Sequence, residues 1–581
     1  MLRTRWLGRV RYGDALALQR GLFRRPGTDY LLLLEHEPVY TLGVRANLAN
    51  LRRPPDELGA ELVRADRGGD VTYHGPGQLV GYPILDVAGH RGGGMADTAG
   101  YVAGVAQVLV EALADLGLPG CFYDPRYPGV WVSSVGGAAP KKIAAIGVRL
   151  SRGRCMHGFA LNVTDEVLDA FSRIVACGLA DRKVTTLASE GVGVGMSQVV
   201  DAVMVRAGQR WGQPPSAGPA ADPTALPAAD GSLIDRADVV WRHGPADLTP
   251  FSRGLGAGKP VRLQGRLAQA GVGEGLTITS PKPEWLRPRV RHDQPVLQLR
   301  QLVRSLDLVT VCEEAGCPNL SECWADGTAT FMINGERCTR ACGFCLVDTS
   351  KPLPLDLGEP ARVAQAVATM GLSFAVVTAV ARDDLADGGA SGFAATIAAI
   401  RALAPGCAVE VLFPDCKGDP ASLAIIFQAR PDVANHNIET VARLQRAARP
   451  SASYARSLGV LAAAKEAGLV TKSSIIVGMG ETDHELRQTL DDLAAIGVDI
   501  VTIGQYLRPT SHHLAVARWV EPATFVELAA YGEAQGISHV EASPLTRSSY
   551  HARQAASAAA GSTAVGSSAV TLRARRVSAR S

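Results

Sequence analysis

The stretches Cys312-Glu-Glu-Ala-Gly-Cys317-Pro-Asn-Leu-Ser-Glu-Cys323 and Cys338-Thr-Arg-Ala-Cys342-Gly-Phe-Cys345 lie close together in the second half of the chain. Each supplies three thiolates, which can bind three irons of a 4Fe–4S cluster and leave the fourth without a cysteine. An open iron can bind a small molecule. The C-x3-C-x2-C spacing therefore predicts a cluster that binds S-adenosylmethionine (SAM) for radical chemistry. A structural zinc site is the alternative, but zinc prefers a closed set of four ligands.

The sequence around and after these cysteines alternates between helical and strand patterns. Repeated helix–strand units predict a parallel sheet wrapped by helices. Too few units are visible for a closed eight-fold barrel, so we expect a partial, open TIM-type βα barrel. The predicted helix–strand pairs are 363–370 with 374–380, 392–403 with 408–413, 458–467 with 471–477, and 483–496 with 499–506.

The rest of the chain divides by composition. The first part mixes strand and helix patterns, which predicts an α/β domain with a largely antiparallel or mixed sheet, so that the fold class overall is α/β and α+β. A stretch rich in Pro, Ala and Gly follows and predicts a linker with an unassigned junction. Beyond the barrel the chain is rich in Ala, Ser, Gly and Arg, which is typical of a disordered tail. The predicted boundaries are 1–212, 213–280, 281–552 and 553–581.

Composition excludes several classes of protein. Of the 581 residues, 47% are hydrophobic, which is typical of a globular chain. A net charge of +3 is too small for a nucleic-acid binder, and no apolar run is long enough to span a membrane. Six of the eleven cysteines lie in the two triplets, so cysteine use points to metal binding in a reducing compartment rather than to disulfides. We expect a cytoplasmic protein.

Residues from 283 to about 552 resemble lipoyl synthase, a radical SAM family. The resemblance implies that Cys338, Cys342 and Cys345 hold the SAM-binding 4Fe–4S cluster. It implies that the other triplet holds a second, auxiliary 4Fe–4S cluster whose sulfide is consumed as the sulfur donor. The motifs that carry it are Lys282-Pro-Glu-Trp-Leu-Arg287, Val311-Cys-Glu-Glu-Ala-Gly-Cys-Pro-Asn319, Gly327-Thr-Ala-Thr-Phe-Met-Ile333, Arg382-Asp-Asp-Leu385, Asn435-His-Asn437, Gly504-Gln-Tyr-Leu507 and Arg547-Ser-Ser-Tyr-His551.

A serine completes the auxiliary cluster in this family, and the motif match places it at Ser549. A serine oxygen is a harder and weaker partner for iron than a thiolate, so it can dissociate as the cluster is dismantled. Without the resemblance, Ser549 reads as a helix cap or turn residue, which is the commoner role of serine.

The first part of the chain carries a glycine-rich bend, Arg67-Gly-Gly-Asp-Val-Thr-Tyr-His74, followed by Gly75-Pro-Gly-Gln78. Residues 6–211 resemble the octanoyltransferases of the lipoyl(octanoyl) transferase family, which implies a biotin and lipoate ligase-like fold. Other matching segments are Leu33-Leu-Glu-His-Glu-Pro-Val-Tyr-Thr-Leu-Gly43, Tyr127-Pro-Gly-Val-Trp131, Lys142-Ile-Ala-Ala-Ile-Gly-Val148, His157-Gly-Phe-Ala-Leu-Asn-Val163 and Cys177-Gly178.

This resemblance implies a cysteine–lysine pair, Cys177 and Lys142, as the catalytic residues. A thiolate is a good nucleophile toward a thioester, and a nearby ammonium lowers the pKa of a thiol. Lys141 competes for the role, but neighbouring strand residues face opposite ways, so only one of the two can point into the site. His74 is expected to orient the thioester, and a purely structural His74 is the rival interpretation.

The octanoyl chain is expected to lie among small and apolar residues, which gain about 0.8 kcal/mol for each buried methylene. By the resemblance these substrate-binding residues are Arg67, Gly68, Gly69, Asp70, Val71, Thr72, Tyr73, His74, Ala145, Ile146, Gly147, Gly158, Phe159 and Ala160.

Together the two resemblances imply a bifunctional lipoylation enzyme, an octanoyltransferase joined to a lipoyl synthase. Its expected partners are octanoyl-acyl carrier protein, the lipoyl domains of 2-oxoacid dehydrogenases or glycine cleavage proteins, and an electron donor such as ferredoxin or flavodoxin. Three alternatives remain open. The second half inserts sulfur into another substrate, such as a desthiobiotin-like molecule or a nucleic acid; the first half is a non-catalytic docking module; or the stretch 231–280 prevents one half from folding.

Overall fold

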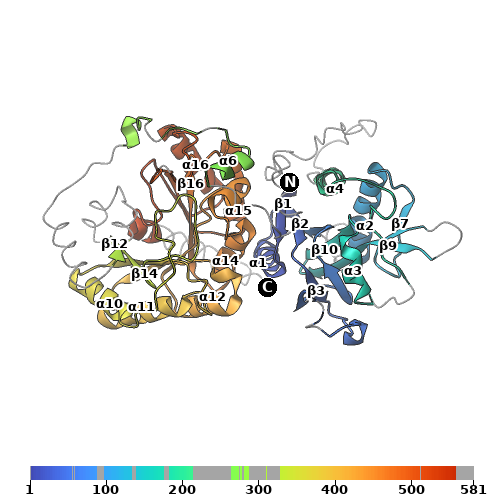
Figure 1. The fold of residues 1–581 in the computed structure, drawn as a ribbon, viewed down its shortest axis with the longest axis horizontal. Helices are drawn as coiled ribbons and strands as arrows, with labels where there is room; N and C mark the ends of the chain where they lie inside the picture. Colours follow the sequence, from blue (N-terminus) through green and yellow to red (C-terminus); the bar gives the residue numbers. More distant parts are fainter. Residues whose placement is uncertain are drawn as a thin grey trace, which may run out of the picture. The chain divides into compact units, whose positions relative to one another are not determined.

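A computed structural model describes residues 2–54, 57, 59–87, 97–133, 139–175, 182–212, 263–273, 275–277, 280–286, 309–310, 328–510 and 512–557 (Figure 1). The chain forms two compact units, Met1–Gly258 and Lys259–Ser581. Most of the predicted linker and tail lies outside the described residues, so the predicted domain boundaries stay predictions. None of the described helices combines the length and the apolar composition needed to cross a bilayer.

The first unit is built on a seven-stranded sheet. Strands β1 and β2 run parallel, and all other neighbouring strands run antiparallel. One face packs against α2 (Thr98–Asp115) and α4 (Met196–Trp211) to form the main core, whereas α1 (Tyr12–Phe23) packs with Met156 in a separate cluster. In sheet order the strands are β1 (Leu2–Val10), β2 (Asp29–His36), β6 (Gln78–Ile84), β10 (Arg154–Asn162), β9 (Lys141–Ser151), β8 (Gly129–Val132) and β7 (Cys121–Tyr123).

A small second sheet carries the glycine-rich bend. Its strand order is β4 (Glu61–Arg64), β3 (Val39–Leu42) and β5 (Val71–His74), and α3 (Glu166–Ser172) packs on it. The predicted α/β domain with a largely antiparallel or mixed sheet is confirmed. The sequence did not reveal β1 or this small sheet.

The second unit is an open barrel of parallel strands, as predicted. Strands β12 to β18 are parallel and follow one another in sequence order, and β11 pairs antiparallel with β12 at one edge. The strands are β11 (Val309–Thr310), β12 (Thr328–Ile333), β13 (Phe374–Ala379), β14 (Ala408–Leu412), β15 (Val433–Asn435), β16 (Val470–Val477), β17 (Ile500–Gln505) and β18 (His539–Ala542).

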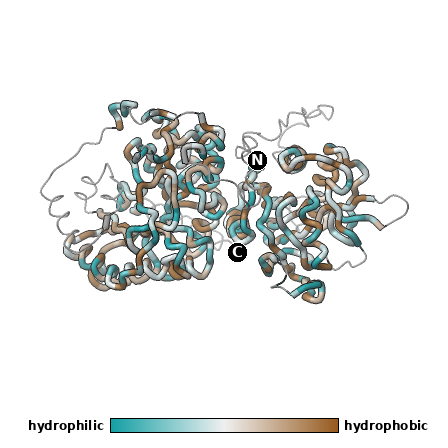
Figure 2. Tube along the Cα trace, in the orientation of Figure 1, coloured by the Kyte–Doolittle hydropathy of each residue, from teal (hydrophilic) through white to brown (hydrophobic). Residues whose placement is uncertain are grey.

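Helices cover the outside of this barrel, and hydrophobic and hydrophilic residues alternate along them in Figure 2. Such alternation is expected of helices with one buried face. Helix α15 (Asp483–Ala495) begins with a capping box, in which Thr482 and Glu485 each accept a hydrogen bond from the other's main-chain N–H. The helices are α10 (Glu359–Thr369), α11 (Ala390–Leu403), α12 (Pro420–Gln428), α14 (Tyr454–Glu466), α15 (Asp483–Ala495) and α16 (Pro522–Ala534).

Part of the predicted junction folds onto the barrel. Helix α6 (Leu263–Gln269) packs beside α13 (Gln445–Ala448), and Leu267 and Ala270 are buried. Arg443 donates a hydrogen bond of 2.5 Å to the main-chain oxygen of Ala270. Residues 263–270 therefore belong to the second unit and not to a connection, because their apolar side chains have a surface on which to bury.

The end of the chain closes one end of the barrel. Residues 552–557 are helical; Ala552 packs against Phe374 and Val433, and Ala555 packs against Ile500. These three partners are the first residues of β13, β15 and β17, so the segment fills the amino-terminal end of the barrel. The folded part extends at least to residue 557, five residues beyond the predicted limit, and 558–581 lie outside the described residues.

A buried ion pair crosses the barrel interior. Val409 and Val411 of β14 pack with the surrounding helices, so Glu410 between them points inward. Its carboxylate accepts hydrogen bonds from Lys472 Nζ at 3.0 and 3.1 Å and from Asn435 Nδ2 at 2.8 Å. Both charged side chains are fully buried, so the charge of each is stabilised by the opposite charge of the other.

Replacing Lys472 alone by methionine is expected to lower the free energy of unfolding of the second unit by about 3–5 kcal/mol, because Glu410 stays buried without a cation. The double variant Lys472→Met with Glu410→Gln should recover most of this loss, since glutamine is neutral and still accepts from Asn435. Denaturant unfolding followed by hydrogen exchange of the barrel strands measures both. Equal losses in the single and double variants would contradict the ion-pair interpretation.

Candidate functional site

The cysteine loop after β12 is held by main-chain hydrogen bonds to distant segments. The N–H groups of Cys338, Thr339 and Gly343 donate to the carbonyl oxygens of Asp348, Ala381 and Ala448. Ala381 follows β13 and Ala448 ends α13, so the loop rests across the carboxyl-terminal end of the barrel strands. Ligands of open α/β sheets bind at this end. The thiols of Cys338, Cys342 and Cys345 are partly buried and close enough to influence one another.

The three thiols fit a 4Fe–4S cluster better than a single ion. Among the described residues, no three His, Cys, Asp or Glu side chains converge on a point where one ion could bind. A cluster needs no such point, because each thiolate binds a different iron. Burial raises the pKa of Cys342 to about 12 and also raises the pKa of Cys345, so these thiols need iron in place of the proton to become thiolates.

Polar residues from the barrel surround the cysteine loop. Arg449 donates to the main-chain oxygens of Asn437 and Ile438 and lies near enough to Cys342 to lower the pKa of its thiol. Glu439, which accepts from Asn437 Nδ2 at 3.1 Å, acts in the opposite direction on Cys342. Its φ of 67° is rare for a residue with a Cβ, and such strain concentrates at functional sites.

His513 holds the last cysteine and was not found from the sequence. Its Nε2 lies 2.9 Å from the main-chain oxygen of Cys345, which only accepts, so Nε2 carries the proton. Its Nδ1 then accepts from Thr510 Oγ1 at 2.8 Å. The loop after β17 therefore helps to fix the cysteine loop. No motif in the sequence signals this contact, because the two residues are 168 positions apart.

The predicted auxiliary site is only partly described. Cys312, Cys317 and Cys323 lie outside the described residues, so nothing shows whether they meet Ser549. Ser549 itself is half-buried, and packing holds the chain in place on both sides of it. On one side Thr546 is packed so close to Gly504 that any Cβ at 504 would lie 1.9 Å from the Thr546 oxygen. On the other side Ala552 is anchored at the barrel base.

In the first unit, the two adjacent lysines of β9 separate as predicted. Lys142 is buried; its Nζ donates to the Pro128 oxygen at 3.2 Å and lies 4.9 Å from the centre of the Trp131 ring. Lys141 instead donates to Glu190 at 2.6 Å and is one-third exposed. A Cβ on residue 129 would lie 2.7 Å from the Lys142 side chain, so Gly129 makes room for this lysine.

A chain of hydrogen bonds fixes the tautomer of His74. The amide nitrogen of Gln78 donates to Tyr73 and Asn162, so its oxygen accepts from His74 Nδ1 at 2.8 Å. His74 Nε2 therefore carries no proton and accepts from Thr41 Oγ1 at 3.3 Å, since that hydroxyl already accepts from Arg67. Burial lowers the pKa of His74 well below 6.5, so the ring is neutral.

The predicted substrate-binding segments lie together in the first unit. On β9 and β10, Gly147 pairs with Gly158, Ile146 with Phe159, and Ala145 with Ala160. Gly68 N donates to the Val148 oxygen, and a Cβ on residue 147 would lie 2.8 Å from the Gly68 oxygen. Glycine at 147 thus allows the 67–70 bend to approach β9. Arg67 is buried and donates to Thr41, Gly68 and Asp70, which stabilises the bend itself.

Cys177, the predicted nucleophile, lies outside the described residues. The structure therefore places Lys142, His74 and the three segments above, but not their relation to that thiol.

Two family models match the chain. The model for the lipoyl protein ligase A/B catalytic domain matches residues 11–206, and that for the radical SAM superfamily matches residues 332–493. The chain is 52% identical over 303 residues to a lipoyl synthase of Mycobacterium leprae, covering 52% of this chain and 96% of that protein. It is 53% identical over 287 residues to one of Mycobacterium tuberculosis, covering 49% and 92%. The chain belongs to the lipoyl synthase family.

Solved structures add little to this relationship. A bipartite lipoate protein ligase of Thermoplasma acidophilum is 17% identical, covering 36% of this chain and 84% of that one, with a TM-score of 0.30. A methylornithine synthase is 13% identical, covering 47% and 77%, with a TM-score of 0.31. Scores of this size support no comparison of the sites.

The matches establish a fusion. An acyltransferase-type domain of the lipoyl protein ligase A/B family is joined to a radical SAM lipoyl synthase in one chain. Membership of the lipoyl synthase family means that SAM and iron–sulfur chemistry belong to this protein, as the cysteine spacing predicted.

The buried histidines of the ligase-type unit are expected to make its stability depend on pH. Burial lowers the pKa of His36 to about 4 and that of His74 well below 6.5. Between about pH 6.5 and pH 4 the unfolded chain therefore binds more protons than the folded one, so stability falls as pH falls. Each histidine can change the folding equilibrium by about tenfold per pH unit.

Denaturant unfolding of the full chain between pH 4 and 7, with hydrogen exchange reporting on the first unit, measures this slope. His36→Gln should reduce the slope of the free energy of unfolding against pH by the contribution of one histidine. An unchanged slope in that variant would show that His36 does not carry the effect.

Proposed function

We propose that the protein makes lipoyl groups on protein lysines in two consecutive reactions. The first unit transfers an octanoyl group from acyl carrier protein to a lysine of a lipoyl domain, and the second inserts sulfur at carbons 6 and 8 of that chain. The observation that carries this proposal is the presence of both catalytic families in one chain. The acceptors are the lipoyl domains of 2-oxoacid dehydrogenases or glycine cleavage proteins.

Cys177 and Lys142 perform the first reaction. The Cys177 thiolate attacks the octanoyl thioester, and the carrier's thiol leaves with a proton. The acceptor amine then attacks the new thioester, forms the amide and releases Cys177. Lys142 is suited to the proton transfers, because its ammonium is held in a buried position by the Pro128 oxygen and the Trp131 ring.

His74 and the paired glycines shape the first site. The neutral, hydrogen-bonded ring of His74 cannot act as a strong acid, so its role is to hold Thr41 and the 67–74 bend in place. Gly147 lets the 67–70 bend approach β9, and Gly158 lies close to Gly81 of β6, so these glycines bring the predicted substrate-binding segments together. We assign the substrate contacts to the predicted segments 67–74, 145–147 and 158–160.

Two sets of residues hold the cofactors of the second reaction. Cys338, Cys342 and Cys345 bind the cluster that chelates SAM, and Cys312, Cys317, Cys323 and Ser549 bind the auxiliary cluster. When bound, these groups supply the radical that removes hydrogen from the alkyl chain and the sulfur that replaces it. The protein's own part is to fix the loop through Ala381, Ala448 and His513, and to place Arg449 beside Cys342.

Lys142→Met is expected to slow octanoyl transfer by about a hundredfold or more, because a positioned proton carrier contributes at least that factor. Lys141→Met serves as the matched control, since its ammonium pairs with Glu190 at the site's edge; it should retain most of the activity. The rate is read as octanoyl mass added to an apo lipoyl domain. Equal losses in both variants would remove Lys142 from its assigned role.

Anaerobic reconstitution with octanoyl carrier protein, an apo lipoyl domain, SAM and a reductant tests the whole proposal. The acceptor mass should rise in two stages, and the loaded chain should hold about eight irons, as two four-iron clusters require. Replacing the cysteines of the auxiliary triplet by alanine should remove about half of the iron and stop the product at octanoyl-lysine while SAM is still cleaved.

A non-catalytic first unit is the alternative, and one variant decides it. Cys177→Ala should abolish octanoyl transfer while the chain still converts a pre-octanoylated lipoyl domain. Unchanged octanoyl transfer would exclude Cys177 as the nucleophile, and absence of transfer in the wild-type chain would favour a docking role.

A further inference from the structure

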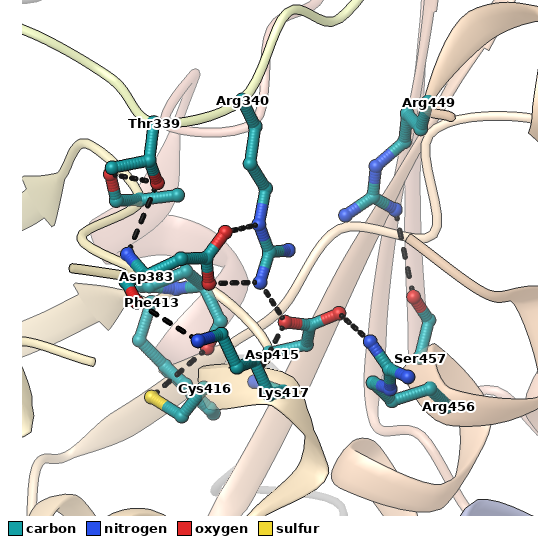
Figure 3. A network of polar contacts seen from close by, with 12 residues as sticks. Thr339, Arg340, Asp383, Phe413, Asp415, Cys416, Lys417, Arg449, Arg456 and Ser457 are labelled. Atoms are coloured by element: carbon teal, nitrogen blue, oxygen red, sulfur yellow. Dashed lines mark hydrogen bonds and ion pairs between the residues drawn. The ribbon is translucent and has the colours of Figure 1, made fainter. Parts of the chain in front are cut away.

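Arg340 lies inside the cysteine loop, midway between Cys338 and Cys342, but its side chain leaves the loop. The guanidinium is buried and bridges two carboxylates (Figure 3). Its Nε and Nη2 donate to both oxygens of Asp383 at 2.7 and 2.8 Å, and Nη2 also donates to Asp415 at 2.6 Å. Asp383 lies beyond β13 and Asp415 beyond β14, so one side chain ties the loop to two barrel strands.

Asp415 is the fixed centre of this network. It is fully buried, and its second oxygen lies 3.4 Å from Arg456 of α14. The following residues, Cys416 and Lys417, have φ of 43° and 54°, a rare conformation that the carboxylate supports by accepting from Lys417 N at 3.1 Å. The Lys417 ammonium donates a hydrogen bond of 2.8 Å to the main-chain oxygen of Asp383. The two guanidinium groups balance the two carboxylates, and Lys417 is exposed, so the network carries no net buried charge.

The main chain of Arg340 faces a predicted cluster ligand. Its N–H donates to Cys338 Sγ at 3.4 Å. The residue before it is fixed as well, because Thr339 Oγ1 donates to the Ala381 oxygen and accepts from Asp383 N. Asp383 thus binds both the side chain of Arg340 and the side chain of Thr339. The position of the N–H that reaches the sulfur follows from these contacts.

We propose that Arg340 is a positioning residue that holds its own N–H against the Cys338 sulfur and thereby sets the reduction potential of the SAM-binding cluster. The inference rests on the proposed function for the identity of that cluster. Hydrogen bonds to cluster sulfurs are among the determinants of the potential. They favour the reduced state, because one electron added to the cluster increases the negative charge on its sulfurs. Loss of the clamp therefore makes the cluster harder to reduce.

The test compares full-length wild type with Arg340→Met, Arg340→Lys and a control, Arg443→Met. The Arg443 side chain is buried and has the same fork geometry, donating to both oxygens of Glu485 of α15 at 2.7 and 2.8 Å. It also donates to the main-chain oxygens of Ala270 and Gly480. The measurements are the midpoint potential of the SAM-responsive EPR signal under dithionite titration, and hydrogen exchange of amides 338–345 in the cluster-free chain. Dithionite supplies the single electron in each titration.

Arg340→Met should shift the midpoint to a more negative potential. It should also speed exchange of amides 338–345 by about tenfold or more, because exchange follows local opening of the loop that Arg340 holds. Arg340→Lys should give a smaller change, because an ammonium keeps the charge without the fork. Arg443→Met should change neither quantity. An unshifted potential in a loaded Arg340→Met protein would overturn the proposal.

Two further outcomes are also decisive. If Arg340→Met does not retain a cluster, exchange in the cluster-free chains decides: equal exchange in wild type and Arg340→Met would overturn the clamp, and faster exchange in Arg340→Met would support it. If wild type itself binds no SAM-responsive cluster, the proposed function fails, and the exchange comparison still shows whether Arg340 holds the loop.

Discussion

The second unit depends on one interaction, the fork of Arg340 between Asp383 and Asp415. A cysteine loop has few apolar side chains of its own, so packing alone cannot fix its height above the barrel. The carboxylates stand at the ends of two parallel strands, which are the most rigid points available. Because Asp415 is also held from α14 by Arg456, displacement of the loop would leave a buried carboxylate with one guanidinium in place of two. The loop geometry is thus coupled to the integrity of the barrel.

The first unit reaches the same end with one cation, Arg67, and a chain of neutral groups. Arg67, Thr41, His74, Gln78 and Asn162 form a continuous chain of hydrogen bonds in which each donor and acceptor has one possible direction. The chain ends on the Thr185 oxygen, and the N–H of Thr185 donates to the oxygen of Lys142. The bend and the lysine strand are therefore parts of one network. Such a fully satisfied network specifies a single arrangement of a buried polar region.

The sequence was informative where the pattern was local. Apolar runs gave strands such as 374–379 and 470–477, and cysteine spacing gave the metal chemistry. Strand β15 has only three residues, too short for any period, and β1 contains three arginines that hide its buried positions, among them Arg5. The partners of Arg340 are 43 and 75 residues away, so no local spacing reports them. Strand alternation predicted that Lys141 and Lys142 face opposite ways, because that rule acts between neighbours.

Charge balance explains why the position of the loop and the electrostatic field at its cysteines depend on different residues. The three thiolates bring negative charge into a partly buried loop, and a net negative support beneath them would oppose the arrival of an electron. The Arg340 network pairs its carboxylates with guanidinium groups, so it fixes geometry without adding negative charge. Arg449 donates to the main-chain oxygens of Asn437 and Ile438 and to the hydroxyl of Ser457 (Figure 3). Its positive charge lies near Cys342 and lowers the pKa of that thiol. Position and field can therefore change independently, because separate arginines carry them.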